Sequence, residues 1–150
     1  MYKSLAEVGG IKYTPEEQAF AQKIYATLIS PTDELGSQSK VQPFDYERPG
    51  LGSTDVGDVS WTVPTVGLRT ATWVPGTPAH SWQAVAAGGT SIGLKGMLVA
   101  AKSMALTAID LFTDPTHIQQ ARAEFDKRRG QGFKYTTRLS DRKPALDYRK

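Results

Sequence analysis

The sequence predicts an α/β fold with a small sheet, and three observations support this class. Two short runs rich in β-branched residues, 63–66 and 68–74, have the composition of strands. Apolar residues recur at helical spacing before these runs, in residues 14–30, and after them, in residues 91–112. Two or three short strands cannot form a stable sheet alone, so we expect the rest of the sheet to come from other polypeptide.

The first helix is predicted over residues 14–30 by a capping box. Thr14 provides the N-cap hydroxyl, Pro15 fits the first helical position and Glu17 follows the cap by three residues. Pro31 is expected to end the helix. One apolar face runs through Phe20, Ile24 and Leu28. The helix therefore packs on a core, and nothing in it indicates chemistry.

Residues 31–58 form a long segment punctuated by glycine and proline, which predicts a loop. A loop of this length in a compact domain is uncommon and is usually functional or disordered. Its second half places Asp55 and Asp58 three residues apart among glycines and hydroxyls. Carboxylates in that setting can bind a cation, but aspartates beside glycines more commonly satisfy N–H groups of turns. By spacing alone the turn is favoured.

A second loop, residues 75–82, precedes a long apolar helix over residues 91–112 that we expect to be buried, with Thr90 or Ser91 as its cap. Glycines before it and in its first turns should permit close backbone approach. A last helix is predicted to start at Asp114 and Pro115 and to end near Gly130.

The chain has two histidines, and only one lies where chemistry is expected. His117 falls in the first turn of the last helix, which favours a solvent-exposed polar role. His80 lies on the loop between a strand-like run and the glycine-opened helix, where side chains often reach ligand crevices. Imidazole is a common zinc ligand, and a core or capping histidine is an equally good interpretation from composition alone.

Composition excludes several classes. The chain has 150 residues, 39% of them apolar and 22% charged, which suits one domain or part of a larger one. The lack of cysteine excludes a disulfide scaffold, a cysteine zinc module and a thiol nucleophile. No apolar run approaches the ~20 residues of a membrane span, and no secretion signal opens the sequence. We therefore expect a soluble, cytoplasmic protein without a membrane partner.

Charge is distributed unevenly along the sequence. Residues 1–114 have eight basic and eleven acidic side chains, a net charge of −3, whereas residues 115–150 have ten basic and four acidic, a net charge of +6. A basic end can bind nucleic acid, but it is more commonly a solvated helix followed by a mobile terminus. We favour the second interpretation and expect no nucleic-acid partner.

Four motifs carry a resemblance to a known family. They are Gly52-Ser53-Thr54-Asp55-Val56-Gly57-Asp58-Val59-Ser60-Trp61, Pro64-Thr65, Gly76-Thr77-Pro78-Ala79-His80-Ser81-Trp82-Gln83 and Thr90-Ser91-Ile92-Gly93-Leu94-Lys95-Gly96-Met97. From about residue 14 to about residue 115, the chain resembles the C-terminal third of the aminobenzoyl-glutamate utilisation protein B-like amidohydrolases. These are di-zinc enzymes related to aminoacylase and glutamate carboxypeptidase.

The resemblance implies a fold and a set of site residues. Residues 1–130 would be the C-terminal portion of a three-layer zinc-peptidase-like catalytic domain, without its lid domain, and residues 131–150 a basic tail that we expect to be mobile. His80 takes the position of a metal ligand, for zinc or manganese. Ser53 and Asp55 take positions that line the active site. Thr54 stands where relatives have an acidic residue, and no role is carried over to it.

The resemblance also implies a function. The complete enzyme would hydrolyse an N-acyl glutamate amide such as aminobenzoyl-glutamate. The other metal ligands and the general base of the family precede this region, and residues 1–13 cannot supply them. We therefore assign no catalytic residue here and expect the isolated chain to be inactive and to hold no metal. The alternative is an independently folded module that associates with itself or with a companion subunit, covering apolar surface with a homo-oligomeric or subunit contact.

Overall fold

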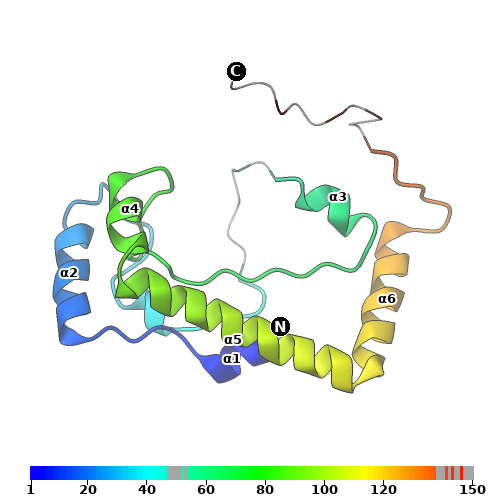
Figure 1. The fold of residues 1–150 in the computed structure, drawn as a ribbon, viewed down its shortest axis with the longest axis horizontal. Helices are drawn as coiled ribbons and strands as arrows, with labels where there is room; N and C mark the ends of the chain where they lie inside the picture. Colours follow the sequence, from blue (N-terminus) through cyan, green and yellow to red (C-terminus); the bar gives the residue numbers. More distant parts are fainter. Residues whose placement is uncertain (47–51, 53, 138–140, 142, 144–145, 147–150) are drawn as a thin grey trace. The chain divides into compact units, whose positions relative to one another are not determined.

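The computed structural model describes residues 1–46, 52, 54–137, 141, 143 and 146, and these residues form helices and loops with no strand among them (Figure 1). The predicted α/β class is therefore wrong for the part of the chain that the structure describes. Because no sheet is present, a partial three-layer zinc-peptidase-like arrangement is not formed by these residues either. The chain divides into two compact units, residues 1–49 with 66–115, and residues 50–65 with 116–150.

The predicted strands lack neighbours to pair with. A strand is stable only when its N–H and C=O groups bond to an adjacent strand. The N–H of Val63 instead donates to the carbonyl of Val59, which extends a helical turn, and the N–H of Thr72 donates within its own segment to Thr70. β-Branched residues favour a pleated surface only where such a surface exists. The segment from 64 to 74 is accordingly not assigned to any regular element.

In the first unit, α1 (Tyr2–Val8) is followed by α2 (Pro15–Tyr25). The predicted capping box is confirmed, because the hydroxyl of Thr14 accepts the N–H of Glu17 at 3.3 Å and the carboxylate of Glu17 accepts the N–H of Thr14 at 2.7 Å. The helix ends at Tyr25, earlier than predicted. The hydroxyl of Thr27 donates to the carbonyl of Ile24 at 2.6 Å, and such side-chain bonds compete with helix continuation.

The core of this unit is small and is shared by several segments. Next in the chain come the short 3₁₀ helix η1 (Ser37–Ser39), α4 (Trp82–Gly88) and α5 (Ser91–Thr113). The buried cluster comprises Ala21, Ile24, Val74, Ala87 and Ile92, with partly buried aromatic side chains of α2 packed against it. In Figure 1, α2 and α4 stand near the start of α5, whereas α1 lies along it.

Helix α5 confirms the predicted boundaries but not the predicted burial. Thr90 caps it, accepting the N–H of Ile92 at 3.3 Å. Close backbone approach is confirmed at Gly93 and Gly96, where an added Cβ would lie 2.1 Å from the carbonyl oxygen of Gly88 and 2.5 Å from that of Ala71. The large apolar side chains, however, are mostly exposed: Leu94, Met97, Leu98, Met104, Ile109 and Phe112. Apart from Ile92, the helix packs with its small residues and exposes most of its large ones.

The same helix corrects the prediction about apolar runs. By length and composition alone, α5 is sufficient to cross a membrane, although a single such helix is weak evidence for a span. Less than a third of its most apolar window is buried within the described residues. The cytoplasmic location stays a prediction.

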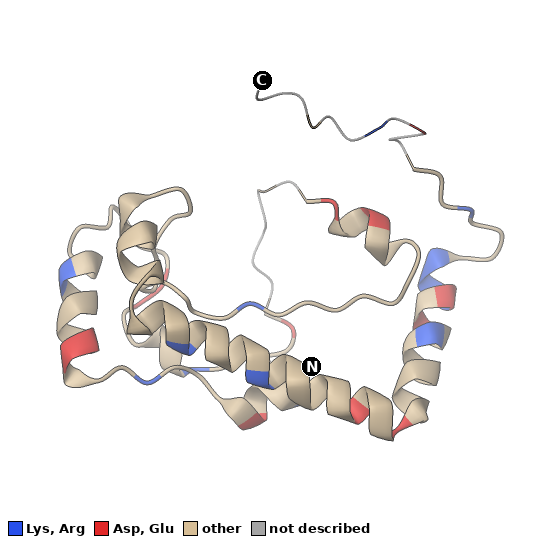
Figure 2. Cartoon of the chain, viewed as in Figure 1, with Lys and Arg blue, Asp and Glu red and all other residues tan. Residues whose placement is uncertain are grey.

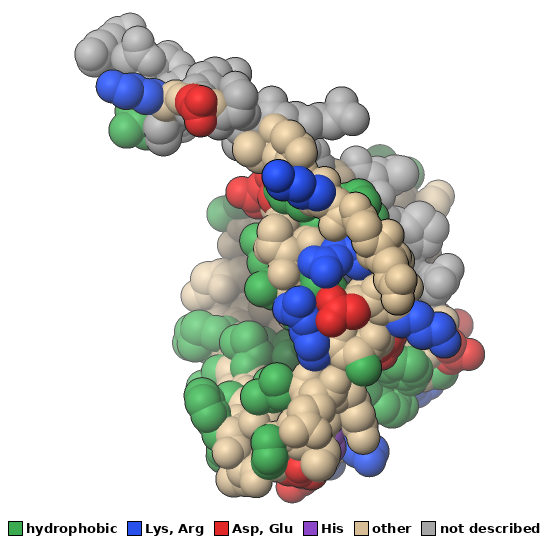
Figure 3. Space-filling model, turned by 90° about the vertical axis from the view of Figure 1, so that its right-hand side faces the viewer, with side chains coloured by type: hydrophobic (Ala, Val, Ile, Leu, Met, Phe, Trp, Pro, Cys, Tyr) green, Lys and Arg blue, Asp and Glu red, His purple; other side chains and the backbone are tan. Residues whose placement is uncertain are grey.

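The second unit contains α3 (Val56–Ser60) and α6 (Pro115–Arg129), the latter confirming the predicted last helix. Phe125 is the buried residue of α6, with the guanidinium groups of Arg122 and Arg129 at 5.2 and 4.8 Å from its ring centre. Trp61 stacks on Phe133 with ring centres 4.8 Å apart. Helix α6 carries both basic and acidic side chains on its surface (Figure 2). On the face that Figure 3 shows, hydrophobic side chains lie beside charged ones.

The assignment of residues 1–130 to a catalytic-domain portion and of 131–150 to a tail stays a prediction. Within the second unit, the start of the predicted tail is in contact with other residues. Phe133 packs on Trp61, and the hydroxyl of Tyr135 donates to Asp58, a bond that raises the pKa of Tyr135.

Candidate functional site

His80 lies on the loop that precedes α4, in a backbone conformation that side-chain-bearing residues rarely adopt. Its φ is 60°, in the left-handed region. Ser81 follows as the N-cap of α4, accepting the N–H of Ala84 at 3.2 Å and donating to the carbonyl of Pro78 at 2.8 Å. These two bonds fix the turn. Because Ser81 provides the cap and the imidazole of His80 is exposed, the interpretation of His80 as a core or capping residue is wrong.

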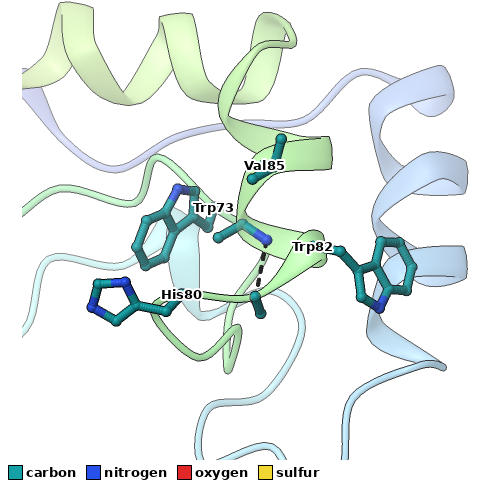
Figure 4. Close-up of a pocket in the computed structure, with 6 residues that line it drawn as sticks. Trp73, His80, Trp82 and Val85 are labelled. Carbon is teal, nitrogen blue, oxygen red and sulfur yellow. Dashed lines mark hydrogen bonds between the residues drawn. The ribbon is translucent and has the colours of Figure 1, made fainter.

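The imidazole borders an open pocket of about 480 Å³ in the first unit (Figure 4). Its lining is mostly apolar and comes from Trp73 and from the start of α4: His80, Ser81, Trp82, Ala84 and Val85. Figure 4 shows the imidazole of His80 and the indole of Trp73 on the same side of this helix start, with the indole of Trp82 pointing away from them. An aromatic or apolar group can rest in such a pocket beside a ring nitrogen that forms a hydrogen bond.

The pocket by itself does not fit a zinc or manganese ion. A catalytic zinc takes three protein ligands and one water. Among the described residues, no three histidine, aspartate or glutamate side chains are grouped closely enough to hold a metal. The lining contains one imidazole and no carboxylate. No chemical step through a bound metal can therefore be derived from these residues alone.

Of the two predicted lining residues, the structure describes one, Asp55. Ser53 is outside the described residues. Asp55 belongs to the second unit and is exposed at the N-cap position of α3, yet its side chain makes no capping bond. The hydroxyl of Thr54 accepts the N–H of Val56 at 3.2 Å instead. The prediction that Asp55 caps this turn is wrong, and its side chain remains at the surface.

A buried carboxylate that the sequence did not single out for chemistry ties α2 to α5. Glu17 is 8% exposed; one oxygen accepts the hydroxyl of Ser91 at 2.6 Å and the other accepts the ammonium of Lys95 at 2.5 Å. Burial by itself raises the pKa of Glu17, but the hydrogen bonds from Lys95, Ser91 and Thr14 outweigh it and lower the pKa to about 2.

Glu17 is therefore ionised and fully bonded, which suits a structural tie and not a general base. Its capping role could be predicted from the spacing to Thr14, but its pairing with a lysine 78 residues later could not. Near it, burial and the charge of Glu17 raise the pKa of Tyr13 to about 12. The hydroxyl of Tyr13 has no hydrogen-bond partner among the described residues.

Comparison with known proteins gives one informative relative. No family model matches the chain, and no solved structure matches it. The chain is 36% identical over 148 residues to a p-aminobenzoyl-glutamate hydrolase subunit of Escherichia coli (strain K12). The similarity covers 83% of this chain and 31% of the relative, so the chain spans about a third of that protein's length. This coverage is consistent with the predicted C-terminal placement. The resemblance predicted from the motifs is thereby confirmed: over most of its length, the chain is similar to part of an aminobenzoyl-glutamate utilisation protein B-like protein.

Proposed function

We propose that this chain is the C-terminal segment of an amidohydrolase that cleaves an N-acyl glutamate amide of the aminobenzoyl-glutamate type. Two findings support the proposal. The similarity to the hydrolase subunit extends over 83% of the chain. His80, the position to which the resemblance assigns a role, lies exposed at the edge of a pocket instead of in the core. That exposure is the observation on which the site assignment depends.

In the complete enzyme, His80 would supply one ligand of a zinc or manganese ion, while Ser53 and Asp55 would line the substrate site. The described residues offer no second and third ligand close to His80. The isolated chain is therefore proposed to be inactive and to bind divalent zinc only weakly, because metal affinity depends on a full set of deprotonated ligands.

A chimera tests this function. Residues of the Escherichia coli relative that match this chain are replaced by the chain itself, and hydrolysis of aminobenzoyl-glutamate and zinc content are measured. We expect the chimera to retain activity, and His80→Ala to lower it at least ~100-fold together with bound zinc, because the remaining ligands alone hold the metal poorly. His117→Ala, which removes the other histidine, is the control and should leave both readouts unchanged. An active His80→Ala chimera with full zinc content contradicts the assignment.

The isolated chain provides the complementary measurement. With zinc added, it should show no turnover of aminobenzoyl-glutamate above buffer. Zinc-dependent turnover that disappears in His80→Ala would contradict the proposal that the chain needs other polypeptide to complete its site.

A second candidate function is that of an association module, and α5 favours it. Large apolar side chains of this helix are half exposed or more, and the buried core of the chain is small. Contiguous apolar surface of this kind usually marks a protein contact. The relative is named as a subunit, so a companion subunit and a second copy of this chain are both candidates for the contact.

A further inference from the structure

Apart from Ile92, helix α5 buries small residues and exposes large apolar ones. The residues that it buries are Ile92, Gly93, Gly96, Ser103 and Thr107. The side chains that it exposes are larger and apolar: Leu94 55%, Met97 53%, Leu98 51%, Met104 52%, Ile109 56% and Phe112 89%. In soluble proteins a helix of this kind turns its apolar stripe towards a core. Every residue of α5 is described, and these side chains remain half exposed or more in the described structure.

The spacing of the stripe indicates what can cover it. Its central line, which we call the α5 seam, consists of Leu94, Leu98, Ala101, Ala105, Ala108 and Phe112. The intervals are four, three, four, three and four residues, which is the heptad spacing of helices that pack side by side. Such a seam drifts by only ~20° per heptad, so a partner helix follows it at a shallow crossing angle. The seam contains no charged residue, and pairing along it buries no ion.

The seam positions are symmetric about the level of residue 103. Leu94 and Phe112 each lie nine residues from that level and Ala101 and Ala105 two residues from it, and the alanines let two backbones approach closely. A two-fold axis between Ala101 and Ala105 would place Leu94 of one copy against Phe112 of the other, and Ala101 against Ala105. The exposed apolar side chains of α5 amount to roughly 700 Å², near the ~800 Å² that each partner gives to a stable interface. Both properties match a second copy of the same surface.

We propose that α5 pairs with α5 of a second copy of this chain, antiparallel, with the two-fold axis between Ala101 and Ala105. The inference deepens the second candidate function by naming its partner, and it does not depend on the hydrolase assignment. Binding of a companion subunit to a monomeric chain is the competing outcome in the experiments below.

Sedimentation of the purified full chain tests the pairing. We expect a dimer at micromolar concentration, with Leu98→Glu and Ala105→Glu each weakening the dimer at least ~30-fold, because each variant buries two carboxylates in an apolar contact. Ile29→Glu is the matched control, since Ile29 is 96% exposed, lies in the same unit and is outside the seam. Circular dichroism confirms that the helix content of each variant is unchanged. A monomeric wild-type chain, or a dimer equally stable in Leu98→Glu, overturns the proposal.

Single cysteines test the orientation, and the chain is suited to this because it has no cysteine of its own. In an equal mixture of Ala101→Cys and Ala105→Cys chains, the two thiols face each other across the axis, within the ~4.4–6.8 Å between Cα atoms that a disulfide needs. In the antiparallel pair, two copies of Leu94→Cys lie at least ~27 Å apart, since each is about nine residues from the axis. We expect the mixture to cross-link on mild oxidation and Leu94→Cys alone not to do so. Cross-linking of Leu94→Cys to itself indicates a parallel pair and overturns the proposed arrangement.

Discussion

The first turns of α5 and its last turns meet different surroundings, although the residues come from one continuous helix. At the start, Ile92 is 1% exposed and Lys95 is bonded to Glu17 of α2. Towards the end, Ile109 is 56% exposed and Phe112 is 89% exposed. Apolar composition is similar in both halves. The difference teaches that hydrophobicity alone does not bury a side chain; a neighbouring element of the right shape has to be present.

The largest expected effect contrasts two isoleucines of this helix. Ile92→Ala should lower the free energy of unfolding by about 3 kcal/mol, because it opens a cavity in a small core. Ile109→Ala removes the same atoms from an exposed position and should change stability by less than ~0.5 kcal/mol when the chain is monomeric. Urea denaturation at low concentration measures both. Equal losses in the two variants would show that the halves of α5 are packed alike.

A second pair of variants sharpens the comparison at the backbone. Gly96→Ala should cost about 2 kcal/mol, because its Cβ would lie 2.5 Å from the carbonyl oxygen of Ala71 and the helix must move away. Gly89→Ala is the control: nothing lies within 4 Å of its added Cβ, and its φ of −84° suits alanine. That variant should be neutral or stabilising by up to ~1 kcal/mol. Thermal unfolding followed by circular dichroism distinguishes the opposite signs.

The smallest expected effect concerns the tie between α2 and the start of α5. Because the pKa of Glu17 is lowered to about 2 from 4.5, its contribution is complete above pH 4.5 and is lost as the pH falls towards 2. Glu17→Gln should therefore cost about 1–2 kcal/mol at pH 7 and much less near pH 2. The control Glu7→Gln makes the same change at an exposed position of α1. A stability difference between wild type and Glu17→Gln that does not change with pH would contradict the role of the charge.

Local signals in the sequence predicted the starts of α2, α5 and α6, whereas α1, α3 and α4 were not predicted. The capping box at Thr14, the cap at Thr90 and the proline after Asp114 each involve residues at most three positions apart, so their geometry is independent of the rest of the fold. The strands failed for the opposite reason. Residues 63–74 have strand composition, but a strand also requires a partner, and pattern within one segment cannot show whether a partner exists.

The candidate site was predictable only in part. The glycine- and proline-rich loop and its histidine were visible in the sequence, whereas the exposure of His80, its left-handed backbone and the pocket beside Trp73 depend on how the loop folds onto α4. The metal role of His80 and the lining roles of Ser53 and Asp55 remain predictions for the chimera to test. The burial of Glu17 with Lys95 brings together residues 78 positions apart, for which no local signal exists.

The sequence by itself determined where α2, α5 and α6 begin, that Thr14 and Thr90 cap the first two of these helices, and the resemblance to a hydrolase subunit that the comparison later confirmed. Only the tertiary structure decided that the described strand-like residues have no sheet to join, that His80 is accessible, and that α5 buries Ile92 with glycine and hydroxyl side chains while most of its leucines and its phenylalanine are exposed. Helix signals act over one or two turns of backbone. Burial and pairing depend on which distant surface is present, and that information is not contained in any single segment.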